Sequence, residues 1–184
     1  MKENQSFILA FDLGTTGLKA ALFDEELSFQ ASTVSQYKTH HREPGWAEQD
    51  PEDWWQAVRS ACTDLLSANP DARNKIEVIG VCGHMLGCLA VDTEGNPLRP
   101  AIIHSDNRAV SECEALSESL GAEYIYRLTG NQAAAQSPLC KIIWLKRNEP
   151  DSYKRSQYLI QSKDFLSGRL TAKWGHSDYS DASH

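Results

Sequence analysis

The stretch FILAFDLGTTGLKAALFD, residues 7–24, constrains the fold of this chain more than any other part of the sequence. Two short apolar runs, 7–12 and 18–24, flank a loop of two glycines and two threonines, and Asp12 stands just before that loop. Apolar runs of this length around a glycine-containing turn predict two strands joined by a hairpin. We expect Gly14 and Gly17 to need a positive φ or a close approach of the backbone.

Three interpretations of this turn are open. It is an ordinary hairpin turn, since glycine and threonine are common there, or a phosphate cradle, in which backbone N–H groups and the hydroxyls of Thr15 and Thr16 bind an anion. In a cradle Asp12 would hold Mg²⁺ through water. A Walker-type or dinucleotide loop is disfavoured, because neither spacing is present and a strand follows the loop. Lys19 either reaches a phosphate or is an ordinary surface lysine.

The rest of the chain predicts an α/β domain with a mixed sheet. A third strand, 29–34, completes an antiparallel meander, and a long helix begins at Pro51 with Asp50 as its cap and ends at Asn69-Pro70. The apolar run 76–83 predicts a strand that is buried on both faces. Further strands are expected within 86–92, 100–104 and 158–161. Further helices are expected over 112–120, 123–128 and 163–171, the last interrupted by Gly168, and within 137–150, where Pro138 lies near the start of the helix and Pro150 beyond its end.

Length and charge narrow the classes of function. The 184 residues suggest about one domain, and a net charge of −7 argues against nucleic acid and anionic membranes as partners. The basic residues late in the chain are therefore interpreted as solvated helix faces and ends: Lys141, Lys146, Arg147, Lys154 and Arg155.

The remaining composition points to the cytoplasm. The N-terminus has no secretion-signal pattern, and no apolar run approaches the ~18 residues of a membrane span. Five cysteines form neither a CxxC pair nor a zinc spacing, so they are expected as small core residues in a reducing compartment.

Several stretches, in order along the chain, resemble a known family. FDLGTTGLKAALFD resembles the first phosphate hairpin of the actin-like ATPase superfamily, and PGWAEQDPEDWW is similar to the P-x-W-x-E-Q-D-P-x-x-W-W segment of the FGGY carbohydrate kinases. The stretch 78–108 resembles the strand–turn–strand and Asp-x-Arg element of that family. SPLCKIIWLKRNEP resembles the FGGY signature around Lys141 and Trp144, and KDFLSGRLT with SDYSDAS resembles the segment that follows it. The overall pattern is most similar to xylulokinases and related pentulose kinases.

The resemblance implies a ribonuclease-H-like (actin-like ATPase) α/β domain, with a mixed five-stranded type of sheet flanked by helices and incomplete in this chain. It implies an ATP- and Mg²⁺-dependent kinase that phosphorylates a small-molecule sugar, a pentulose such as xylulose. Residues 1–184 would form part of the N-terminal domain, with the C-terminal nucleotide lobe absent, and the full-length protein could be a homodimer. The family's catalytic Asp would lie beyond residue 184, so we expect no catalytic base in this chain and no activity from it alone.

The resemblance also assigns site residues by position. Asp12 would be the metal- and phosphate-associated carboxylate, beside the candidate phosphate-binding residues Gly14, Thr15, Thr16 and Lys19. On the sugar side the candidates are His84, Met85, Leu86, Asp106 and Arg108. Together with His104, Ser105 and Asn107 these supply hydrogen-bonding groups just after apolar strands, as a polyol site needs. The alternative is that the histidines are structural donors and the Asp-Asn-Arg run a helix cap.

The sequence departs from the family pattern at three places. Where the family has Gln-Met-His, this chain has His84-Met85-Leu86, and the Leu86 side chain cannot hydrogen-bond a sugar. His104-Ser105 stand where xylulokinases often have Trp-Asn, and Gln136 does not fit the first position of the signature. We therefore predict a sugar kinase rather than a xylulokinase specifically. The alternative is a non-catalytic actin-like remnant or binding module; a chaperone-like ATPase is disfavoured by the Trp46, Asp50 and Trp55 segment.

Overall fold

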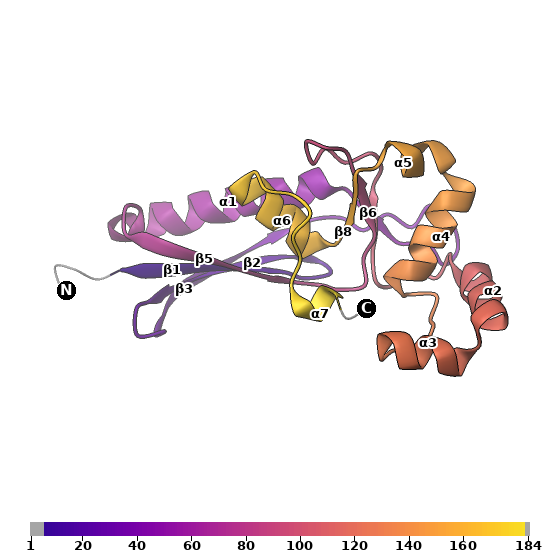
Figure 1. Cartoon of the computed structure of the whole chain (residues 1–184). Helices are drawn as coiled ribbons and strands as arrows, with labels where there is room; N and C mark the ends of the chain where they lie inside the picture. Colours follow the sequence, from indigo (N-terminus) through magenta and orange to yellow (C-terminus); the bar gives the residue numbers. More distant parts are fainter. Residues whose placement is uncertain (1–5, 183–184) are drawn as a thin grey trace. The chain divides into compact units, whose positions relative to one another are not determined.

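The computed structural model describes residues 6–182, and the chain divides into two compact units (Figure 1). The first unit holds the chain up to Lys38 together with residues 52–83. The second holds residues 39–51 and the chain from His84 onward. Among residues 6–182 no helix combines the length and apolar character needed to cross a membrane.

The first unit is built on a mixed four-stranded sheet in the order β3-β2-β1-β5. Its first three strands form the predicted antiparallel meander, and β5 joins β1 in parallel, so the predicted mixed α/β sheet is confirmed. The strands are β1 (Phe7–Leu13), β2 (Gly17–Asp24), β3 (Phe29–Gln36) and β5 (Ile76–Gly83).

The core of the first unit comes from one face of the sheet and one stripe of a helix. In β1 the side chains of Leu9, Phe11 and Leu13 are buried and alternate with more exposed ones, as the period of two of a strand requires. Helix α1 (Pro51–Ala68) begins at the proline, as predicted, and ends before Asn69 and the short 3₁₀ turn η1 (Pro70–Ala72). Its buried residues recur at helical spacing: Trp54, Ala57, Val58, Ala61 and Leu65.

The prediction that β5 is buried on both faces is wrong. Within the described residues β5 is an edge strand that pairs only with β1. Val78 is 55% exposed and Ile79, on the opposite face of the strand, is 46% exposed. The apolar run correctly predicted a strand, but burial also needs covering elements on both faces, which the described residues do not supply.

The second unit combines two short two-stranded sheets with helices. β4 pairs with β7, and β6 pairs with β8, both antiparallel. Its core includes Cys88, Ile102, Cys140, Trp144 and Leu145. The elements are β4 (Glu48–Gln49), β6 (Leu89–Val91), β7 (Ala101–Ile102), α2 (Val110–Leu120), α3 (Ala122–Thr129), α4 (Pro138–Asn148), α5 (Pro150–Arg155), β8 (Tyr158–Ile160), α6 (Ser162–Thr171) and α7 (Tyr179–Ala182).

Two helix predictions need correction. Gly168 does not interrupt α6, which continues to Thr171. The glycine instead makes room for the Trp174 indole, because a Cβ atom at this position would lie 2.2 Å from a ring carbon. Pro150, expected only to stop the preceding helix, also begins α5, where proline is well tolerated at the first position.

The exposed apolar strand β5 predicts self-association of this chain. An uncovered strand edge with apolar side chains is a template for pairing with another chain. We expect sedimentation velocity to show concentration-dependent self-association of the wild type, and less of it in the Val78→Thr/Ile79→Thr double variant, which keeps β-branched residues on the strand.

The control for this experiment is Leu128→Thr, which removes an equally apolar side chain that is 70% exposed on α3. It should leave the self-association unchanged. A wild-type chain that stays monomeric at every concentration tested contradicts the prediction.

Candidate functional site

The turn between β1 and β2 is tight, and its glycines are needed for space rather than for their φ angles. The amide of Gly14 donates a hydrogen bond to the carbonyl of Gly17 over 3.0 Å. Neither glycine has a positive φ, so the first of the two expected reasons for a glycine does not apply. The expected close approach is present: a Cβ atom on Gly17 would lie 2.8 Å from the backbone oxygen of Ser35 in β3.

The polar side chains of this turn face solvent. Asp12, Thr15, Thr16 and Lys19 are all exposed, and Asp12 lies directly opposite Lys19 in the β1–β2 pair. The structure therefore brings the predicted phosphate- and metal-binding residues together at one end of the hairpin. A carboxylate, two hydroxyls and an ammonium there form a donor set suited to Mg²⁺ and phosphate groups.

Tyr37, just after β3, supports this turn and was missed from the sequence. Its hydroxyl donates a hydrogen bond to the Gly14 carbonyl, and its amide donates to the Thr16 carbonyl over 3.4 Å. Burial and, second, the negative charge of Asp12 raise the pKa of Tyr37 well above its usual value, so the hydroxyl keeps its proton. The sequence feature that could have indicated this support is a tyrosine at the end of the third strand.

In the second unit, residues 84–86 form a half-buried turn that α6 anchors. The hydroxyl of Ser162 donates to the carbonyl of His84 over 2.8 Å, and the amide of Gly87 donates to Oε1 of Gln161 over 3.3 Å. Leu86 has a φ of 61°, which is unusual for a residue with a side chain of this size. The turn therefore has a fixed but unfavourable backbone conformation.

The imidazole of His84 lies beside that of His104, with 5.9 Å between the ring centroids. Burial, then the neighbouring His104 and Lys141, lower the pKa of His84 to about 4. Burial and the charge of Lys141 also lower the pKa of His104. Both rings are therefore neutral at pH 7, and a neutral imidazole offers one donor and one acceptor, which matches a sugar hydroxyl.

Asp106 and Arg108 are buried and make their hydrogen bonds within the protein. The Asp106 carboxylate accepts from the Ala47 amide over 2.5 Å and from Nη2 of Arg108 over 2.8 Å. The Arg108 guanidinium lies against the rings of both Trp46 and Trp144, at 3.7 and 4.8 Å from their centroids. Their direct contact with a sugar stays a prediction, and this geometry points to a supporting role for the pair.

Glu48 extends this buried network. Its Oε1 lies 2.8 Å from Nη1 of Arg108 and 2.5 Å from Nη2 of Arg99, and the Nε of Arg99 lies 2.8 Å from a carboxylate oxygen of Glu149. The side chains of Glu48, Arg99 and Arg108 are at most 6% exposed. Alternating charges of this kind can be buried because each is paired and hydrogen-bonded.

The prediction that Lys141 lies on a solvated helix face is wrong. Lys141 is fully buried, and its ammonium donates to the carbonyls of Leu86 over 2.6 Å and Ile103 over 2.9 Å. Burial lowers its pKa to about 8, partly opposed by the charge of Asp106. The other late basic residues are exposed, as predicted: Lys146, Arg147, Lys154 and Arg155.

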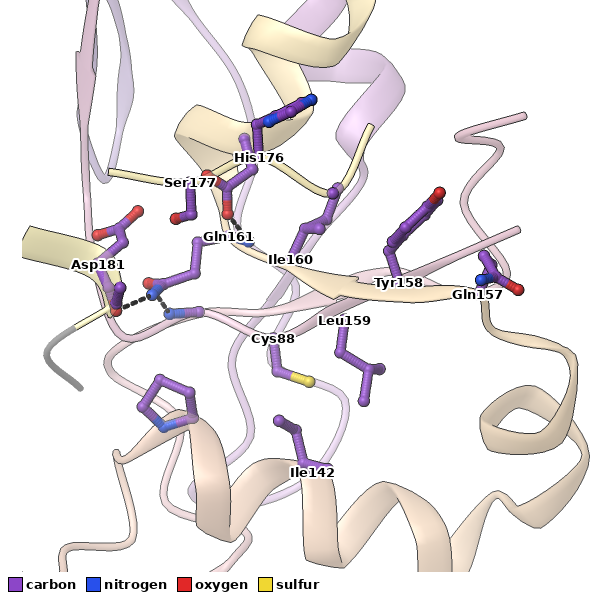
Figure 2. Close-up of a pocket in the computed structure, with 15 residues that line it drawn as sticks. Cys88, Ile142, Gln157, Tyr158, Leu159, Ile160, Gln161, His176, Ser177 and Asp181 are labelled. Atoms are coloured by element: carbon purple, nitrogen blue, oxygen red, sulfur yellow. Dashed lines mark hydrogen bonds between the residues drawn. The ribbon is translucent and has the colours of Figure 1, made fainter. Parts of the chain in front are cut away.

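A cavity of about 440 Å³ in the second unit was not predicted (Figure 2). Its polar end holds Gln161, whose amide nitrogen donates to the Asp181 carbonyl over 3.2 Å, while Cys88 and Ile142 contribute apolar surface. None of the site residues predicted from the sequence lines it. Within residues 6–182 no cluster of three or more His, Cys, Asp or Glu side chains is arranged to hold a metal ion.

Comparison with known proteins gives consistent matches over nearly the whole chain. Residues 7–184 match the family described as "FGGY family of carbohydrate kinases, N-terminal domain". The xylulose kinase of Staphylococcus xylosus is 33% identical over 178 residues, which cover 97% of this chain and 36% of that protein. The xylulose kinase of Escherichia coli K12 is 31% identical over 95% of this chain and 35% of its own length.

A solved structure described as a xyloylose kinase from Brucella ovis superposes with a TM-score of 0.91 at 34% identity, covering 96% of this chain and 36% of that one. The predicted resemblance and fold are confirmed by these matches. The chain spans about a third of the length of the curated relatives that it matches.

The close approach at Gly17 predicts that Gly17→Ala destabilises the hairpin. The added methyl would meet backbone atoms of β3, which cannot rotate away, so we expect a loss of about 1–3 kcal/mol in the free energy of unfolding. Urea denaturation measures this loss.

Gly80→Ala is the matched control, because it lies in β5 of the same sheet and a Cβ atom there meets nothing within 4 Å. It should change the stability by less than about 0.5 kcal/mol. Equal losses in the two variants would refute the steric argument.

The hydrogen bond from Tyr37 to Gly14 predicts that Tyr37→Phe lowers the free energy of unfolding by about 1 kcal/mol and speeds amide exchange in the hairpin. Tyr179→Phe, at a side chain that is 98% exposed, should have no effect. The pH dependence is a second signature. Because the pKa of Tyr37 is higher in the folded than in the unfolded state, its contribution is complete below pH 10 and is lost as the pH rises further.

Tyr37→Phe should lack this alkaline loss, which thermal melts between pH 8 and 11 would measure. A variant whose alkaline profile matches the wild type contradicts the assignment.

Proposed function

The chain belongs to the FGGY family of carbohydrate kinases, and from that premise we propose that it forms part of the N-terminal lobe of an ATP-dependent kinase that phosphorylates a pentulose such as xylulose. The observation that carries this proposal is the β1–β2 hairpin, where Asp12 and two threonines are exposed around a turn too tight for a side chain at Gly17. That turn has the form and the donor set of a phosphate site.

The hairpin residues fit ATP and Mg²⁺. ATP would supply the phosphoryl group that is transferred, and Mg²⁺ would offset the charge of its phosphates. Asp12 is exposed and can hold the cation directly or through water. The hydroxyls of Thr15 and Thr16 can donate to phosphate oxygens, and Lys19 adds positive charge on the neighbouring strand.

The 84–86 turn and His104 are proposed to bind the sugar. A buried sugar hydroxyl needs a partner, and the neutral imidazoles of His84 and His104 can each donate to one hydroxyl and accept from another. Met85 would contribute apolar contact with the sugar carbons, and so would the side chain of Leu86. Asp106 and Arg108 are proposed to support the site without contacting the sugar, by holding the segment that carries His104.

The identity of the sugar is a separate part of the proposal. The curated relatives cited above are named as xylulose kinases. Leu86 cannot donate or accept a hydrogen bond, however, so one hydroxyl must be bound by another group or the sugar must differ from xylulose. We propose a pentulose as the substrate class and leave its stereochemistry to the experiment below.

We propose that the general base and the second, nucleotide-binding lobe are not among these 184 residues. The curated relatives are nearly three times as long as the matched region, and phosphoryl transfer needs a carboxylate that accepts the hydroxyl proton. On this view the isolated chain catalyses nothing, and it would work in the cytoplasm as part of a longer enzyme. A non-catalytic binding module is the alternative.

Ligand binding by the isolated chain tests the proposal. We expect NMR titration with a panel of pentuloses to shift the signals of the 84–86 turn and of His104, and titration with Mg²⁺ and ATP to shift those of the hairpin. Asp12→Asn should abolish the Mg²⁺-dependent part of the hairpin shifts, whereas Asp64→Asn, at an exposed position of α1, should not.

Turnover tests the kinase activity itself. We expect none from the isolated chain with ATP, Mg²⁺ and a pentulose, and turnover from a chimera in which this chain replaces the matching segment of the Staphylococcus xylosus xylulose kinase. Asp12→Asn in the chimera should lower kcat by a factor of 100 or more, about 2.7 kcal/mol, while Asp64→Asn should not. A chimera that binds pentulose but never phosphorylates it supports the binding-module alternative.

A further inference from the structure

Lys141 joins the two segments that carry His84 and His104. Its ammonium is fully buried and donates to the carbonyl of Leu86 over 2.6 Å and to that of Ile103 over 2.9 Å. Leu86 ends the turn that begins at His84, and Ile103 directly precedes His104. One side chain from α4 therefore fixes two separate pieces of backbone, each next to an imidazole of the candidate sugar site.

The backbone of Leu86 needs such a restraint. Its φ of 61° lies in the left-handed region, which a leucine adopts only when surrounding contacts hold it there. The carbonyl of this same residue accepts the shorter of the two Lys141 hydrogen bonds. The amide of Gly87, which belongs to the same peptide group as that carbonyl, donates to Gln161. The peptide group that follows the strained residue is thus held at both its oxygen and its nitrogen.

We propose that Lys141 is a positioning residue that holds Leu86 in its left-handed conformation and sets the distance between the His84 and His104 imidazoles. That these imidazoles contact a sugar rests on the proposed function above, whereas the restraint on the backbone does not. Lysine suits this role because its ammonium is compact and has three rotatable donors at the end of a thin apolar stem.

The charge of Lys141 has a second effect on the same site. Its ammonium lowers the pKa of both histidines, in each case after burial, and so helps to keep both rings neutral. The charged groups that act on Lys141 itself are Asp106, which favours its protonated form, and Arg108, which opposes it. Removing the ammonium should therefore alter the imidazoles as well as the backbone.

The test is Lys141→Met in the full 184-residue chain. Methionine fills a similar volume but cannot donate to either carbonyl. We expect an upward shift of the His84 and His104 pKa values, followed by NMR, and faster amide exchange at residues 86–88. Lys146→Met is the matched control, since it removes an exposed ammonium from the same helix and should change neither readout. Unchanged histidine titrations and exchange in Lys141→Met would overturn the proposal.

A double-mutant cycle with Leu86→Gly tests the restraint on the backbone. Glycine adopts a φ of 61° without strain, so the loss of stability caused by Lys141→Met should be smaller in the Leu86→Gly background than in the wild type. Equal losses in the two backgrounds would contradict the proposal.

If Lys141→Met does not fold, hydrogen exchange of the wild-type lysines still tests whether Lys141 restrains the turn. The Lys141 ammonium protons should exchange with water much more slowly than those of Lys146. Fast exchange at Lys141 counts against the restraint.

Pentulose binding separates this proposal from the proposed function. We expect Lys141→Met to weaken binding about tenfold and Lys146→Met to leave it unchanged. If the wild type binds no sugar, the proposed function fails while the histidine and exchange results still stand. If the wild type binds sugar and Lys141→Met binds it equally well, the positioning role fails alone.

Discussion

The second unit depends on charges that are buried together. Glu48 comes from β4, whereas Arg99, Asp106 and Arg108 come from the segment 99–108 around β7, and their opposite charges alternate at 2.5–2.8 Å. Each charge taken out of water is costly, and its partners repay that cost only if all are in place. Losing one partner from such a network typically costs about 3–5 kcal/mol, because an uncompensated charge remains buried. The network therefore connects β4 with the segment around β7 and, through the ion pair of Arg99 with Glu149, with the end of α4.

This constraint gives the candidate sugar site its support. The Asp106 carboxylate accepts from Arg108 and from the Ala47 amide, and the guanidinium lies against two tryptophan rings, one of which belongs to α4. Lys141 is on the same helix, three residues before Trp144, and reaches the backbone of the sugar-side segments. In the proposed sugar site the imidazoles would thus be supported by a layer of buried charge, which is the kind of preorganisation that a polyol site requires.

Local sequence patterns predicted much of the fold, because hairpins and helix starts depend on residues that are neighbours in the sequence. Short-range rules of strand alternation and helix capping are sufficient for the hairpin at Asp12, with its turn, and for the helix that begins at Pro51. The misses depend on distant contacts. Lys141 resembled other basic residues late in the chain, and nothing near it in the sequence indicates that two carbonyls about 40 and 55 residues away would surround its ammonium.

The glycines illustrate the same division. At Gly17 the sequence predicts a positive φ or a close approach of the backbone, and the structure has the close approach, because β3 passes directly behind this residue. The unusual φ occurs instead at Leu86, where the sequence offers no glycine. A leucine kept in that conformation, when glycine would be less strained, indicates that its side chain is needed there or that the strain helps to define the turn. With Leu86 beside the sugar, as proposed above, its non-polar side chain would select against substrates that present a hydroxyl at that point, and so contribute to specificity by exclusion.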